Sequence, residues 1–333
     1  MDNTTAYSLD NEITSDQLTV IRVFSTLTTI LGTIGNTLTI AAIVYGRLHQ
    51  QASFLFILNL SVCNLIHCVV FLPLLLVQSY HDIWTYNQAA CVAYSFGFFS
   101  VLGAELWLYS CITINRYICV VHHQNYGRYY GGKIVTSVKL IFSWMFYPVT
   151  FLLPLTKFWG DFEYVPKKLV CYPFAGYNCR GFCLFIYVIA IISTVPVIIF
   201  CYLSIIHKYV KTQRKVGLSR EKTVSQTGTA NHVTTVKTDS DKKRAMSEVK
   251  MAFTILAVIS IFGSCRLPFM ILYLYDPSMS KVNPMIHTVL IYIGSCSNFI
   301  NPVIYSFTNK TIFKSLKKMF ATWKKTFEIQ SDR

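Results

Sequence analysis

Seven long apolar segments limit how this chain can fold more than any other feature. Each is long enough to cross the roughly 30 Å hydrocarbon layer of a bilayer as a helix. Lipid offers no hydrogen-bond partner to backbone N–H and C=O groups, so a spanning segment pairs them internally. The segments cover residues 21–45, 54–80, 89–120, 135–157, 181–209, 249–275 and 285–307. We therefore expect an all-α membrane protein, with a seven-helix transmembrane bundle over residues 21–307.

Composition supports a membrane protein. Charged residues make up 14% of the 333 residues, and hydrophobic residues make up 53%. A soluble domain has about 25% charged residues. The net charge of +15 could suit nucleic acid, but the basic residues gather on one side of the spans rather than in one patch. We expect no nucleic-acid partner.

The distribution of Lys and Arg predicts the orientation. Of the 30 basic residues, 23 follow the first, third, fifth or seventh span. Because basic loops stay in the cytoplasm, we expect a multi-pass protein of the plasma membrane with its amino terminus outside and its carboxyl terminus inside. Residues 1–20 form the extracellular amino terminus and have no apolar signal-peptide core. The sequon at Asn3 predicts glycosylation there.

Two cytoplasmic segments lie outside the spans. Residues 210–247 are rich in Lys, Arg, Ser and Thr and have almost no apolar content, which predicts a disordered third loop. Residues 308–333 begin with apolar residues at helical spacing and lysines between them, which predicts a short amphipathic eighth helix on the inner leaflet, in contact with lipids. The apolar residues are Ile312, Phe313, Leu316, Met319 and Phe320.

Short motifs recur through the spans in a fixed order. They are Gly35-Asn36, Leu60 through Asn64, Trp84 with Cys91, Asn115-Arg116-Tyr117, Trp144, Pro196 with Tyr202, Phe262 with Cys265 and Pro268, and Asn301-Pro302-Val303-Ile304-Tyr305. With these motifs the chain resembles a rhodopsin-like (class A) G-protein-coupled receptor over about residues 20–320. Its Asn-Arg-Tyr triplet is similar to that of melatonin receptors and Moody-type receptors. The resemblance implies a receptor that activates a heterotrimeric G protein when an extracellular ligand binds, with arrestin and a receptor kinase as further partners.

The resemblance also implies a switch at the cytoplasmic ends of the third and sixth spans. Arg116, which lies between Asn115 and Tyr117, is expected to pair with Glu248 in the inactive receptor. Outward movement of the sixth helix would break this pair and expose Arg116 to the G protein. In the seventh span, Asn301-Pro302 weakens the helix locally and lets Tyr305 turn inward.

Cysteines near the outer face predict a disulfide. Cys91 and Cys171 fall at outer positions, where oxidation is permitted, and we expect them to be bridged. Cys179 and Cys183 are also close to the outer face, and their pairing is left open by the sequence.

The chain departs from the family pattern at three places. Asn64 replaces the usual acid of the second span, and Arg266 replaces an aromatic residue two positions before Pro268. Pro196 lies six residues before Tyr202 rather than the usual eight, which makes the register of the fifth span uncertain.

Five polar residues are expected to form a core inside the membrane. A lone charge near the bilayer centre costs several kcal/mol, so it usually has a partner or a water-filled cavity. Our hypothesis is that the acid that relatives carry in the second helix stands in the third helix here, as Glu105, and that the fixed guanidinium of Arg266 in the sixth helix replaces the sodium ion held by relatives. The alternative is that each charge finds water and backbone partners separately. The five residues are Asn36, Asn64, Glu105, Arg266 and Asn298.

The ligand is bounded mainly by exclusion. Phe98 stands where an amine receptor has an acid, so a monoamine is not expected. The seventh span has no lysine, which excludes a retinal Schiff base. A lipid-like molecule, a small neutral molecule and a peptide all remain open, as do the G-protein subtype and the oligomeric state. The candidate pocket residues are Tyr94, Phe98, Phe269 and Tyr273.

A transporter or channel is the alternative function, because a midplane Glu/Arg pair and proline-broken helices would suit one. Against it, the sequence has no visible internal repeat, and the switch motifs would then be unexplained. No metal cluster or nucleophile constellation converges within the spans, so we expect no enzyme activity, no metal and no cofactor.

Overall fold

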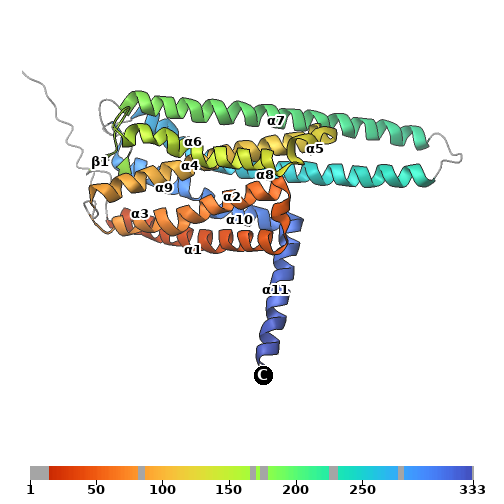
Figure 1. The fold of residues 1–333 in the computed structure, drawn as a ribbon, viewed down its shortest axis with the longest axis horizontal. Coiled ribbons are helices and arrows are strands. Elements are labelled where there is room, and N and C mark those ends of the chain that lie inside the picture. The colour runs from red at the N-terminus through yellow and green to blue at the C-terminus, as the bar shows by residue number, and fades with distance from the viewer. Residues whose placement is uncertain are drawn as a thin grey trace, which may run out of the picture.

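The computed structural model describes residues 15–81, 87–165, 170–172, 179–224, 232–276 and 281–331. Long helices run side by side through the molecule, and the last helix leaves the bundle at a steep angle (Figure 1). The helices are α1 (Ser15–Tyr45), η1 (Leu48–Gln50), α2 (Ala52–Ile66), η2 (His67–Phe71), α3 (Leu72–Gln78), α4 (Gln88–Val121), η3 (His123–Asn125), α5 (Tyr126–Tyr130), α6 (Lys133–Leu155), α7 (Cys179–Val224), α8 (His232–Tyr275), α9 (Pro284–Ser295), α10 (Ser297–Thr308) and α11 (Lys310–Ser331).

Two short strands mark one end of the bundle. β1 (Glu163–Val165) and β2 (Val170–Tyr172) pair antiparallel, with Tyr164 opposite Cys171. Both strands lie against α4. We call this the strand end, and the opposite end, from which α11 leaves, the α11 end (Figure 1).

The helices coincide with the predicted spans. In the described part of the chain, 6 helical stretches are long and apolar enough to cross a membrane. The remaining predicted span is split into α9 and α10, which have 12 residues each and meet at Cys296. Each alone covers about 18 Å at the helical rise, so the two are needed together to cross a bilayer.

The second span contains a wide turn that the sequence pattern did not reveal. Residues His67–Phe71 form a π-helical turn between α2 and α3. Pro73 follows in the first turn of α3, where its missing N–H interrupts the regular hydrogen-bond ladder. His67, at the start of the turn, is 1% exposed and therefore lies in the protein interior.

Contacts between the first and seventh spans explain the Gly35-Asn36 motif. Pro302 has no N–H to donate to the carbonyl of Asn298, four residues earlier. The side chain of Asn36 donates to that carbonyl instead, at 2.8 Å. A Cβ added at Gly35 would lie 2.9 Å from Pro302 Cβ, so glycine allows the close approach of the two helices.

The outer surface of the bundle is apolar, as a lipid environment requires. On α6, side chains at helical spacing face outward and are 45–61% exposed. They are Val138, Ile141, Met145, Val149 and Leu152. An apolar stripe of this kind would be an aggregation liability in water and is normal against lipid.

Two segments differ from the sequence-based expectation. α7 continues to Val224 and α8 begins at His232, so most of residues 210–247 is helical rather than disordered, and residues 225–231 lie outside the described part. The segment is polar but has no proline, and its Lys, Arg, Gln and Glu residues favour helix. α11, with 22 residues, is also longer than the short helix predicted.

Candidate functional site

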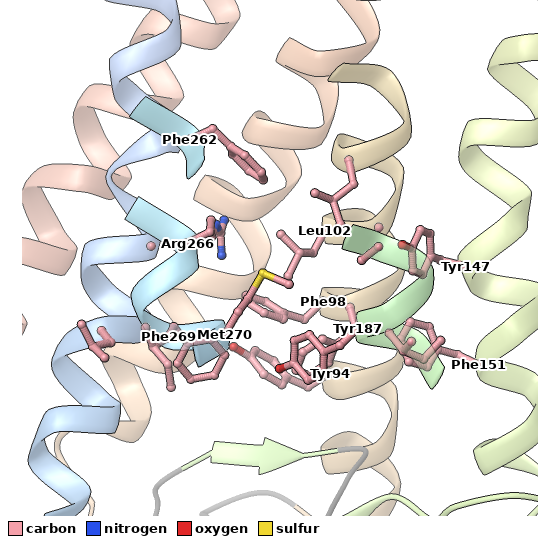
Figure 2. Close-up of a pocket in the computed structure, with 18 residues that line it drawn as sticks. Tyr94, Phe98, Leu102, Tyr147, Phe151, Tyr187, Phe262, Arg266, Phe269 and Met270 are labelled. Atoms are coloured by element: carbon pink, nitrogen blue, oxygen red, sulfur yellow. The ribbon is translucent and has the colours of Figure 1, made fainter. Parts of the chain in front are cut away.

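A pocket lined mainly by apolar side chains lies near the strand end, between α4, α6, α7, α8 and α9 (Figure 2). Phe269 from α8 lines one side of it, and Phe151 from α6 and Tyr187 from α7 line the other side (Figure 2). Phe98 and Tyr94 from α4 lie between these two sides. Three of the four predicted pocket residues therefore line it. The side chain of the fourth, at position 273, lies outside the described residues.

Arg266 brings a charge into this apolar pocket. Among the described lining residues it is the only charged one. Its side chain lies on the face of α8 between Phe262 and Phe269 (Figure 2) and is 8% exposed. A Cβ added at Gly294 would lie 3.2 Å from Arg266 Cδ, so the absence of a side chain there leaves room for the arginine.

Glu105, one position before the lining residue Leu106 on α4, contacts the side chains of Arg266 and His67. Its carboxylate is fully buried, with Oε2 3.9 Å from Arg266 Nη2 and Oε1 3.0 Å from His67 Nδ1. The structure thus brings together the acid and base of our sequence hypothesis. Neither carboxylate oxygen has a hydrogen-bond partner in the described protein, so both contacts lack hydrogen-bond alignment, and His67 Nδ1 also lies 3.2 Å from the carbonyl of Cys63.

His67 was missed by sequence reasoning. A single histidine in an apolar run usually reads as a packing residue. The π-helical turn that begins at His67 could not be read from the pattern. The available signal was Glu105 itself, because a buried carboxylate usually has more than one polar neighbour.

Polar side chains continue from Glu105 toward the α11 end. Asn301 donates to the Tyr109 hydroxyl at 2.9 Å, which ties α10 to α4, and the Tyr109 ring packs on Phe262 with 4.5 Å between centroids. Asn64 and Asn298 are each 1% exposed. Neither Asn64 Nδ2 nor the Asn298 side chain has a hydrogen-bond partner in the described part of the protein. The five predicted core residues are therefore all buried, and the printed links among them are Asn36 to the Asn298 carbonyl and Glu105 to Arg266.

The Asn-Arg-Tyr triplet lies in the last turns of α4, near the α11 end. Asn115 accepts a 2.6 Å hydrogen bond from Ser53 and donates to the Tyr126 hydroxyl at 3.2 Å. Arg116 is 2% exposed. The side chain of Glu248 lies outside the described residues, so the expected Arg116–Glu248 pair stays a prediction.

The outer disulfide is described on one side only. Cys91, in the first turn of α4, is disulfide-bonded. β2 carries Cys171 and lies against α4, but the Cys171 side chain is outside the described residues. The Cys91–Cys171 pairing therefore stays a prediction, and the state of Cys179 stays open. Asn3 also lies outside the described residues.

Comparison with known proteins gives the same picture as the motifs. Residues 35–305 match the model of the 7 transmembrane receptor (rhodopsin family). Protein trapped in endoderm-1 from Drosophila melanogaster is 25% identical over 298 residues, covering 88% of this chain and 75% of that protein. The human melatonin receptor type 1B is 25% identical over 314 residues, covering 91% and 79%. The G-protein coupled receptor moody of Drosophila melanogaster is 24% identical over 346 residues, covering 90% of this chain and 51% of that receptor.

The fold agrees with these relatives. The crystal structure of squid rhodopsin superposes with a TM-score of 0.77 at 18% identity, covering 93% of this chain and 87% of that chain. The predicted seven-helix receptor fold is thereby confirmed. Nothing in these comparisons supports a transporter or channel, and the family consists of signalling receptors rather than enzymes. The chain belongs to the rhodopsin family of seven-transmembrane receptors, and it is a G-protein-coupled receptor that converts the binding of an extracellular ligand into activation of a heterotrimeric G protein.

Proposed function

We propose that the ligand of this receptor binds in the pocket near the strand end, and that this end faces the outside of the cell. The observation that carries the proposal is the position of the Glu105–Arg266 contact. Arg266 lines the pocket on α8, and Glu105 meets it from α4 at 3.9 Å. A molecule in the pocket therefore touches a charged contact between two helices of the bundle.

A ligand in this position can bias a two-state switch. Ligand binding shifts an equilibrium only by its difference in affinity for the two states. Contacts to Arg266 or Phe269 would differ between the states if α8 moves relative to α4. Tyr109 and Asn301 lie further toward the α11 end, where Arg116 would then become available to the G protein.

The proposal also assigns the α11 end to the cytoplasm of a plasma-membrane receptor. The excess of Lys and Arg after the first, third, fifth and seventh spans supports it. α11 would lie on the inner leaflet, with its lysines near anionic lipid. The Ser- and Thr-containing segment between α7 and α8 would be a substrate for a receptor kinase and, once phosphorylated, would attract arrestin. Glycosylation at Asn3, detected as a mass shift on deglycosylation, would support the outer amino terminus.

The site can be tested before the ligand is known. A chemical library is screened for G-protein nucleotide exchange by the purified receptor in nanodiscs. Active compounds are then measured on Ala190→Phe, which adds a ring at a pocket position that is 4% exposed. We expect potency to fall about tenfold or more, because the ring occupies space that the ligand needs.

The matched control is Ile192→Phe, on the same helix but 65% exposed on its outer face. Potency there should equal that of the wild type. Equal potency in both variants for every active compound would place the ligand elsewhere on the receptor.

A further inference from the structure

The pocket combines apolar walls with one cationic side chain that has two nitrogens without a hydrogen-bond partner in the described protein. Arg266 Nε and Nη2 are buried and have no hydrogen-bond partner in the described protein. The contact to Glu105, at 3.9 Å, supplies opposite charge but no hydrogen bond. A guanidinium presents a planar fork of N–H donors that matches an oxyanion, and a buried donor without a partner is costly.

We propose that this receptor takes an apolar molecule that carries one anionic group, and that the anionic group binds Arg266. The inference rests on the proposed function, because it specifies the ligand class for the same pocket. Tyr94, Phe98, Phe151 and Met270 offer the apolar body of the ligand a mainly hydrocarbon surface (Figure 2). Arg266, at the Glu105 side of the pocket, offers its acidic group a fixed point for orientation.

His67 allows Glu105 to remain buried when Arg266 turns toward a ligand. Glu105 Oε1 is 3.0 Å from His67 Nδ1, so the carboxylate keeps one partner. The other titratable side chains that interact electrostatically with Glu105 in the described protein are Cys63, Cys68 and Tyr109, which ordinarily carry no charge at neutral pH.

The pocket wall also contacts His67. The rings of Phe98 and His67 lie 5.2 Å apart in an edge-to-face arrangement. A ligand that displaces Phe98 would therefore also shift His67, while the anionic group of the ligand would bind Arg266. Binding of an acid therefore exchanges the Glu105–Arg266 contact between α4 and α8 for a ligand–Arg266 contact within the pocket. This exchange frees α8 from one of its ties to α4.

The test uses pairs of probes that differ in charge alone. A panel of arylalkyl and medium-chain monocarboxylic acids is compared with the corresponding primary amides. Binding is measured as thermal stabilisation of the purified receptor in nanodiscs, independently of G protein. We expect at least one acid to bind about 10-fold to 100-fold more tightly than its amide, the range for a hydrogen-bonded charge contact. Amides that bind as well as their acids, or a panel in which no acid binds, would overturn the proposal.

Two variants test whether Arg266 causes the tighter binding of acids than of amides. Glu105→Gln removes the competing carboxylate, so acid affinity should rise while amide affinity stays the same. Arg266→Lys keeps the charge but loses the planar fork, so it should retain part of the preference for acids. An unchanged acid affinity in Glu105→Gln would contradict the exchange of partners.

These outcomes separate the ligand class from the site. If neutral compounds activate the receptor and lose potency in Ala190→Phe, the pocket is the ligand site and only the acidic class is wrong. If acids bind equally well to Ala190→Phe and to the wild type, the acids bind outside the pocket, and both the ligand class and the proposed site lose their support.

Discussion

Glu105 depends on two partners that differ in reach and in charge. His67 is the nearer, at 3.0 Å, but is cationic only when protonated. Arg266 always carries its charge but is 3.9 Å away. A buried ion pair contributes little net stability, whereas removal of one partner leaves a charge without compensation. The three side chains should therefore respond unequally to neutralisation.

The first prediction concerns this inequality. Glu105→Gln leaves Arg266 without an acid and should lower the free energy of unfolding by about 3–5 kcal/mol. Arg266→Gln should cost less, because His67 still faces the carboxylate. The double variant should recover part of the loss. Thermal unfolding of the purified receptor in one detergent measures all three.

The matched control for this cycle is Glu328→Gln, which neutralises an exposed glutamate on α11 and should leave the unfolding temperature unchanged. Strictly additive losses in the double variant would mean that Glu105 and Arg266 do not interact. A larger loss for Arg266→Gln than for Glu105→Gln would remove His67 as the second partner.

Tyr109 gives a second prediction at this scale. Tyr109→Phe deletes the hydroxyl that accepts from Asn301 and leaves a buried amide without its partner. We expect a loss of about 1–3 kcal/mol in stability. Tyr147→Phe is the control, because the Tyr147 hydroxyl is buried and has no hydrogen-bond partner in the described protein. Its removal should be neutral or stabilising. Equal effects of the two variants would show that the Tyr109 hydrogen bond contributes nothing.

At the scale of elements, the positions of the spans were predictable and their interruptions were not. A long apolar segment forms a helix in lipid, because its backbone N–H and C=O groups must pair within the segment. The predicted segment 89–120 is accordingly a helix in the structure, α4 (Gln88–Val121). The break at Cys296 and the π turn at His67 lie close to Pro302 and Pro73, and the position of such an interruption is not registered by hydropathy. The same reason explains why Glu105 and Arg266 could be paired from the sequence while His67 could not.

The predicted coupling switch places Arg116 on α4 and Glu248 on α8. Arg116→Ala should abolish G-protein nucleotide exchange while surface expression stays near normal, because Arg116, although only 2% exposed, lies in the last turns of α4. Glu248→Ala should raise basal exchange about fivefold, the shift that corresponds to about 1 kcal/mol of lost closed-state stability. The assay is basal exchange normalised to receptor number. Glu328→Ala serves as the control, and an unchanged basal rate in a well-expressed Glu248→Ala receptor would exclude this pair as the lock.

At the scale of the whole molecule, the bundle already contains a cation beside its buried carboxylate. Because the Arg266 guanidinium fills that role, the Glu105 carboxylate is already paired and is not free to hold a sodium ion. We predict that ligand affinity and basal exchange are the same in sodium chloride and in choline chloride at equal ionic strength. A sodium-dependent shift of more than about threefold would count against the fixed guanidinium, because such a shift requires coupling between a sodium site and the ligand.

α11 has a mechanical consequence for the bundle. The helix has 22 residues, so it extends about 33 Å at the helical rise. Near its start it is fastened to α1, where Ser315 donates to the carbonyl of Ala42. Further along, Thr322 contacts Tyr45 of α1 at 2.9 Å. With α11 on the inner membrane surface, as proposed above, the helix would act as a lever on α1: tilting the bundle by about 10° would lift or sink the far end of α11 by about 6 Å. Its lysines would resist that displacement through their attraction to anionic lipid, and α11 would thereby set the angle at which α1 stands in the bilayer.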